Sequence, residues 1–153
     1  MELDVVTATF LAGSALNAEA LRRLHARGYD GLRIRHGYVI QHVVEGPIPI
    51  GELAGRLGVT QQAASKTVAE LEQLGYLERT ADPADARVRR AGLTARGRAA
   101  VGESRQIRAE IGDELAAALG PRRAATLRAA AADALTWAGG MADVRTRRVV
   151  EPR

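Results

Sequence analysis

The sequence contains no cysteine, and only 3% of its 153 residues are aromatic. The absence of cysteine excludes disulfides, thiolate zinc sites and thiol redox sensing within this chain. No apolar run approaches the ~20 residues that a membrane-spanning helix needs. The N-terminal residues also lack the basic-then-apolar pattern of a signal peptide. We therefore expect a soluble, cytoplasmic protein.

Lysine is almost absent as well: Lys66 is the single lysine among 22 basic residues, and the others are arginine. The net charge is +4 and the sequence pI is about 10.3, a balance that favours a polyanionic partner. Much of the apolar content is alanine, which favours helix but buries little area. A largely helical protein with one core, which gains further burial by oligomerising, fits this composition.

Helical spacing of apolar residues predicts a first helix over about residues 2–27, which Gly28 ends. A second helix is predicted over residues 31–46, ended by Gly46 and Pro47. Towards the C-terminus, residues 94–120 and 121–138 predict two long helices. Pro121 suits the first position of the last helix.

The centre of the chain predicts a helix-turn-helix. A short helix over residues 51–57 and a longer one over 61–74 are joined by Gly58-Val59-Thr60, a turn of the length and composition that this motif uses. The hydroxyl of Thr60 can cap the second helix by accepting a backbone N–H.

The longer helix of this motif has two different faces. At about 100° per residue, one arc of roughly 140° holds Ala63, Ala64, Thr67, Val68, Leu71 and Leu74. The opposite arc holds Gln61, Gln62, Ser65, Lys66, Glu72 and Gln73. Its first two turns carry no acid, and Gln, Ser and Lys are side chains that read base edges or hold phosphates. An ordinary solvated helix face is the alternative interpretation.

A basic hairpin follows this helix. Strands are predicted over residues 76–80 and 87–93, around the turn "ADPADA", with leucines at the base and arginines towards the tip. Asp85 can hydrogen-bond the turn or orient Arg87. A charged edge that blocks aggregation would serve equally with lysine or acids, whereas arginine suits forked phosphate contacts and narrow minor grooves. A helix-turn-helix followed by a basic two-stranded hairpin is a winged helix, so the predicted fold is mainly α with a small β-wing.

The stretch "IPIGELAGRLGVTQQAASKTVAELEQLGYLERTADPADARVRRAGLTARG", residues 48–97, resembles the MarR family (multiple-antibiotic-resistance regulators). The resemblance lies in "ELA..L", the helix ending "LE..GYLER", the wing "DP.D.R" and "LT..G". It implies a winged helix-turn-helix flanked by N- and C-terminal dimerisation helices. It also implies a homodimeric regulator, most often a repressor, that binds pseudo-palindromic operators. Many members of the family release DNA when a small, often aromatic, acid binds.

The resemblance implies boundaries as well as contacts. Residues 1–30 would be an N-terminal dimerisation helix, 31–93 the DNA-binding region, 94–140 the C-terminal dimerisation helices and 141–153 a basic tail. The implied DNA-binding residues are Gln61, Gln62, Ser65 and Lys66 in the major groove, Arg87 in the minor groove with Asp85 as its partner, and Arg79, Arg89 and Arg90 beside it. One departure is Pro49-Ile50, where the family often has a Ser or Thr cap; its loss costs about 1 kcal/mol.

A candidate effector site lies near the junction of the first two helices. Its residues are Tyr29, Arg33, His36, Tyr38 and His42. Arginine with aromatic and imidazole groups suits a carboxylate ligand. The alternative, which we favour, is that these residues cap helices and fill the space between the two regions. The histidines lack i,i+4 pairing, so we expect no metal site and no cofactor.

No serine–histidine–acid arrangement and no glycine-rich phosphate loop is present, so we expect no enzyme activity. The remaining alternative to a DNA-binding regulator is a winged-helix module for protein–protein contact. That alternative predicts an apolar patch on the exposed face of the helix over residues 61–74. Because this face carries Gln, Ser and Lys, DNA binding is the stronger hypothesis.

Overall fold

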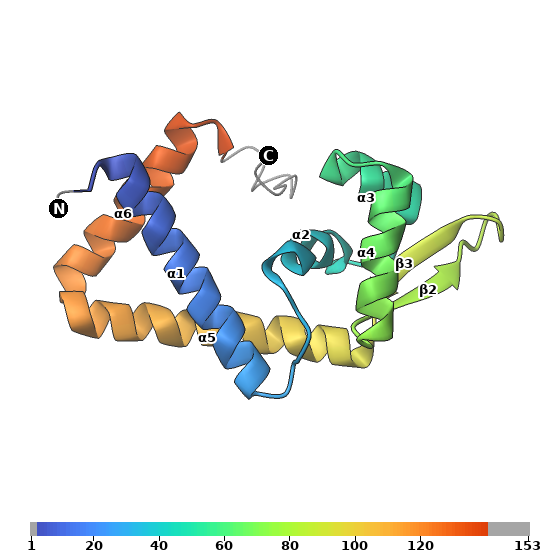
Figure 1. Cartoon of the computed structure of the whole chain (residues 1–153), viewed down its shortest axis with the longest axis horizontal. Helices are drawn as coiled ribbons and strands as arrows, with labels where there is room; N and C mark the ends of the chain where they lie inside the picture. The colour runs from blue at the N-terminus through green and yellow to red at the C-terminus, as the bar shows by residue number, and fades with distance from the viewer. Residues whose placement is uncertain (1–2, 141–153) are drawn as a thin grey trace.

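The computed structural model describes residues 3–140, so the predicted basic tail at 141–153 lies outside the described residues. The described chain forms helices and one small sheet (Figure 1). In chain order the elements are α1 (Val5–Ala26), α2 (Ile34–Val43), β1 (Ile48–Pro49), α3 (Ile50–Leu57), α4 (Gln61–Gln73), β2 (Leu77–Ala81), β3 (Arg89–Leu93), α5 (Ala95–Leu119) and α6 (Pro121–Trp137). The predicted fold class, mainly α with a small β-wing, is confirmed.

The helix-turn-helix forms where the sequence predicts it. α3 ends at Gly58, whose φ of 64° lies in the left-handed region that glycine tolerates. Thr60 caps α4, because its hydroxyl accepts the N–H of Ala63 at 3.2 Å. Pro49 occupies the N-cap of α3 without a side-chain hydrogen bond, as its sequence predicts.

The sheet is antiparallel with strand order β1-β3-β2. Leu77 pairs with Leu93 at the base of the hairpin. All three strands contact the helix-turn-helix, β1 and β3 through α3 and β2 through α4. We call the hairpin, residues 77–93, the wing. The predicted strand over 87–93 is two residues too long at its start. The carboxylate of Asp85 accepts the N–H of Arg87 at 3.0 Å, and the Asp85 carbonyl accepts that of Val88 at 2.9 Å. This local turn holds Arg87 outside the strand.

The core lies between α2, α3, α4 and the sheet, and it extends to α1 and α5. Its most completely buried side chains include Leu53, Val68, Leu71, Tyr76 and Ile107. On α4 the buried positions are Ala64, Val68 and Leu71, which lie on one side of the predicted apolar arc. Ala63, at the opposite edge of that arc, is exposed, so the buried face of α4 is narrower than the predicted arc. α6 contributes no buried residue.

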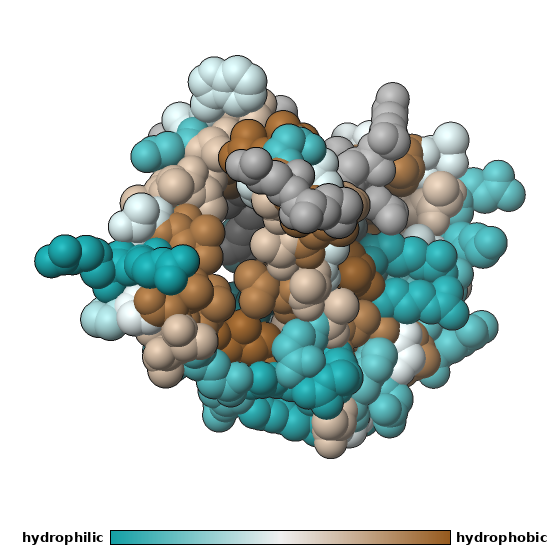
Figure 2. Space-filling view, turned by 60° about the vertical axis from the view of Figure 1, so that its left-hand side comes forward, coloured by the Kyte–Doolittle hydropathy of each residue, from teal (hydrophilic) through white to brown (hydrophobic). Residues whose placement is uncertain are grey.

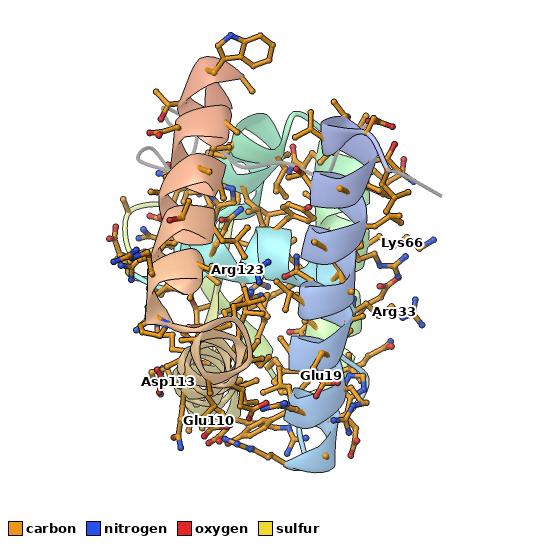
Figure 3. The ribbon with its side chains drawn as sticks, turned by 90° about the vertical axis from the view of Figure 1, so that its left-hand side faces the viewer. Glu19, Arg33, Lys66, Glu110, Asp113 and Arg123 are labelled. Carbon is orange, nitrogen blue, oxygen red and sulfur yellow. The ribbon has the colours of Figure 1, made fainter. Side chains whose placement is uncertain are left out.

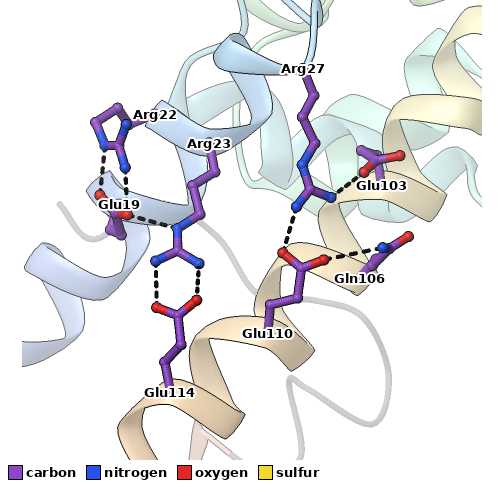
Figure 4. Close-up of polar contacts among 8 residues, drawn as sticks. All are labelled: Glu19, Arg22, Arg23, Arg27, Glu103, Gln106, Glu110 and Glu114. Atoms are coloured by element: carbon purple, nitrogen blue, oxygen red, sulfur yellow. Dashed lines mark hydrogen bonds and ion pairs between the residues drawn. The ribbon is translucent and has the colours of Figure 1, made fainter.

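α1 crosses and packs against α5, which runs from the wing at one end to α6 at the other (Figure 1). Ion pairs join the two helices (Figure 4). Arg23 Nη2 lies 2.6 Å from Glu114 Oε2, and Arg27 pairs with both Glu103 and Glu110. These contacts fix α1 against α5. Over residues 3–140, no helix is both long enough and apolar enough to span a membrane.

Candidate nucleic-acid interface

The polar face of α4 is open to solvent. Gln61, Gln62 and Lys66 are exposed, and none of their side chains forms a hydrogen bond or ion pair with another described residue. Lys66 points away from the body of the molecule (Figure 3). Three adjacent donor-rich side chains with no internal partner are therefore available to an external ligand, and no acid lies among them.

Ser65, the fourth candidate on α4, is half-buried because Arg79 of β2 packs against it. Arg79 Nη2 donates to the Ser65 carbonyl at 2.7 Å, and Arg79 Nε lies 3.4 Å from Glu72 Oε2. Only 28% of the Arg79 side chain is exposed. Of the candidate DNA-binding residues, Arg79 is thus placed between the wing and α4 and joins the two.

The tip of the wing presents Arg87. Its side chain is 92% exposed, and its Nε donates to Asp85 Oδ1 at 3.1 Å. These hydrogen bonds lower the pKa of the Asp85 carboxyl below its ordinary value, so Asp85 remains charged and orients the guanidinium. Asp85 and Arg87 therefore form one unit at the tip.

The other two wing arginines differ from each other. Arg89 is exposed, and its side chain has no hydrogen bond or ion pair with a described residue. Arg90 donates to the Pro47 carbonyl at 2.8 Å and lies 3.4 Å from Asp82 Oδ2, so it fastens β3 to the chain before β1 and to the wing turn. Arg87 and Arg89 are consequently the accessible cations of the wing, whereas Arg79 and Arg90 are engaged within the fold.

A cavity of about 400 Å³ lies between α1, α2 and α5. Of the candidate effector residues, Arg33 and His36 line it, and Tyr29, Tyr38 and His42 do not. Tyr29 instead stacks with Arg96, whose guanidinium carbon is 5.7 Å from the ring centroid, and His42 is buried in α2. Only two of the five predicted effector-site residues therefore line this cavity.

α5 also contributes to this cavity, which the sequence did not predict. Ser104, Arg105 and Arg108 line it, and Arg108 Nη1 donates to Asn17 Oδ1 of α1 at 3.1 Å. A basic, polar stripe on residues 104–108 was visible in the sequence, but nothing local indicates which helix it faces. Within the described part of the chain, no group of three or more His, Cys, Asp or Glu could hold a metal ion.

Residues 30–88 match the family model described as the MarR family. A comparison with curated protein sequences gives no match. Among solved structures, the chain is similar to RV1404 from Mycobacterium tuberculosis, with 26% identity, a TM-score of 0.74, and coverage of 92% of this chain and 97% of that one.

Two further structures share the fold at lower identity. MepR, a transcription regulator of the Staphylococcus aureus multidrug efflux pump MepA, is 17% identical with a TM-score of 0.69, over 88% of this chain and 98% of that one. FabT from Streptococcus pneumoniae, solved in complex with DNA, is 17% identical with a TM-score of 0.64, over 88% and 96%. This chain therefore resembles the MarR family in the sequence of residues 30–88 and in its winged helix-turn-helix fold.

Proposed function

We propose that this protein is a homodimeric, sequence-specific DNA-binding regulator of the cytoplasm that represses transcription from pseudo-palindromic operators. The observation that carries the proposal is the open face of α4 at Gln61, Gln62 and Lys66, beside a wing whose tip presents Arg87. The DNA complex of FabT, which shares this fold, supports it.

The three α4 side chains divide into two roles. Gln61 and Gln62 can each form paired hydrogen bonds with adenine in the major groove. Lys66 supplies a point charge for a phosphate, and each phosphate neutralised contributes about 0.9 to the slope of log K against log salt. Arg87 enters the adjacent minor groove. Base reading by glutamine gives sequence preference, while Lys66 gives affinity that depends on salt.

A second copy of the chain covers the face formed by α1 and α6. Several large apolar side chains are exposed there, including Val5 at 78%, Phe10 at 69% and Trp137 at 91%. Hydrophobic residues gather around a hollow on this face (Figure 2). Helices in proteins depend on tertiary packing for most of their stability, yet α6 buries none of its residues within the described chain. Dimerisation supplies that packing and places two α4 helices about 34–36 Å apart on one side of DNA.

The cavity between α1, α2 and α5 is the proposed effector site, for a small aromatic or acidic molecule. Its apolar wall includes Leu21 and Ile40, and its basic side chains are Arg33, Arg105 and Arg108. An apolar cavity with a few cations in its lining suits a small ligand with an apolar ring and an anionic group.

The proposed function is tested by selecting duplexes from a random pool with the wild-type protein and with Gln62→Ala, Lys66→Ala and Gln73→Ala. Gln73 is exposed at the far end of α4 and serves as the matched control for Gln62. We expect Gln62→Ala to select a different sequence, Lys66→Ala to weaken binding to all sequences, and Gln73→Ala to resemble the wild type.

Failure of the wild type to enrich any sequence would refute specific DNA binding. Enrichment that both Gln62→Ala and Lys66→Ala leave unchanged would show that α4 is not the reading helix. In a transcription assay on the selected duplex, the wild-type protein should lower transcript yield; a rise would identify an activator.

A further inference from the structure

A three-residue contact joins α2 to α4. Arg35 Nη2 donates to Glu70 Oε2 at 2.6 Å, and His36 Nε2 lies 3.3 Å from the same oxygen. His36 is only 2% exposed, although it carries a polar ring. Glu70 lies one helical turn after Lys66, on the flank of α4 that faces α2. The contact therefore fixes how α4, with its exposed face, is rotated against α2.

The tautomer of His36 follows from its second nitrogen. The backbone N–H of Arg33 donates to His36 Nδ1 at 3.2 Å. A backbone amide nitrogen can only donate, so Nδ1 carries no proton and the neutral ring carries its N–H on Nε2. That single N–H donates to Glu70. Burial lowers the pKa of His36 below its ordinary value, against the opposing effect of the hydrogen bond that His36 donates to Glu70, and this favours the neutral form.

His36 also lines the cavity between α1, α2 and α5, together with Gly37 and Ile40 of the same helix. The His36 ring thus contacts Glu70 of α4 and also forms part of the wall of the cavity. The charged groups facing His36 are Glu70 from α4, Arg35 from α2 and Arg33 at the N-cap of α2, while Arg105 and Arg108 of α5 line the same cavity.

We propose that Glu70 is a positioning residue for α4 and that His36 links it to the cavity, so that the cavity's occupant and α4 compete for one imidazole N–H. This inference rests on the proposed function and adds a route for its regulation. An occupant that offers an acceptor to His36, or that displaces the ring, releases Glu70 from one of its two partners. α4 then loses part of the contact that orients Gln62 and Lys66, and affinity for DNA falls.

The link between His36 and Glu70 is tested without DNA or effector. The full chain, labelled with nitrogen-15 at histidine, is titrated by NMR as wild type, Glu70→Gln and Glu78→Gln. His36→Gln assigns the His36 signals, and Glu78 is an exposed acid on β2 that serves as the charge control. We expect a bare Nδ1 and a protonated Nε2 in the wild type. Glu70→Gln should lower the His36 pKa further, because the carboxylate raises it, and Glu78→Gln should leave it unchanged.

The effect on α4 is tested with selected DNA and a cavity filled from α5. Val101→Phe and, independently, Ser104→Phe place a ring in the cavity that both residues line. Glu70→Gln alone should weaken DNA binding by roughly three- to tenfold. Val101→Phe and Ser104→Phe should each weaken DNA binding when introduced into the wild-type protein. In the Glu70→Gln background, each should weaken DNA binding by less than about twofold more, because both changes act through the same contact.

Two results would overturn the inference: identical His36 titrations in wild type and Glu70→Gln, or fully additive losses for filling and Glu70→Gln. A wild-type protein that binds no DNA would instead refute the proposed function, and the titration would still decide whether Glu70 holds His36.

Discussion

Replacing Arg87 with alanine isolates the contribution of the wing. The side chain is 92% exposed and its described partner is Asp85, two residues away, so folding should change little. Loss of a specific arginine contact costs about 1–3 kcal/mol, and a dimer has two wings, so the total is about 2–6 kcal/mol. That corresponds to a fall in affinity of roughly 30-fold to 10⁴-fold. The slope of log K against log salt should decrease by about 1.8.

The assay is a gel-shift titration on a duplex selected by the wild-type protein, repeated at several salt concentrations. Arg22→Ala is the matched control, because Arg22 is also an exposed arginine paired with a nearby carboxylate, Glu19, but lies on α1 away from the wing. The control should bind like the wild type. If Arg87→Ala kept wild-type affinity and salt slope, the wing would not enter the minor groove, whatever α4 does.

Three further predictions concern stability and assembly. Gly97→Ala should destabilise the fold in urea by about 1–3 kcal/mol or more, because a Cβ would lie 2.1 Å from the Tyr76 carbonyl oxygen, whereas Gly102→Ala, with open space around it, should be neutral or stabilising. Phe10→Asp should convert the dimer to monomer in light scattering; an unchanged mass would place the interface elsewhere. In the folded protein the pKa of His36 lies below its ordinary value of 6.5. At pH values between these two pKa values, the unfolded chain therefore binds more protons than the folded one. His36 thus favours folding fully above pH 6.5 and progressively less below it; His36→Gln should lose this component in urea titrations between pH 7.5 and 5.5.

The order of elements follows from local signals. Gly28 and Gly58 take positive φ and end their helices, while Thr60 caps α4. The alternation of leucine and arginine also fixes which side of the wing faces the core, as the Leu77–Leu93 pair shows. Each of these features depends on neighbours a few residues apart, and a sequence displays such neighbours directly.

Whether an individual polar side chain is exposed or engaged within the fold depends instead on partners that are distant in the sequence. Arg79 and Arg90 look like Arg87 in the sequence, but the sheet brings Arg79 against Ser65 and Arg90 against Pro47. The cavity could not be predicted from the sequence either, because its lining residues come from three helices in separate parts of the chain. Glu70 illustrates the same limit: its spacing from Lys66 is plain, whereas its contact with His36 arises only when α2 packs on α4.

In the proposed dimer, two copies of α4 and the wing read DNA together. Footprinting of the wild-type protein on the DNA that flanks its own gene measures this joint contact. We predict two protected half-sites whose centres lie about 10–10.5 base pairs apart, with protection of the outer minor grooves lost in Arg87→Ala. A protein that protects no site, or a single half-site without a symmetric neighbour, would contradict the account.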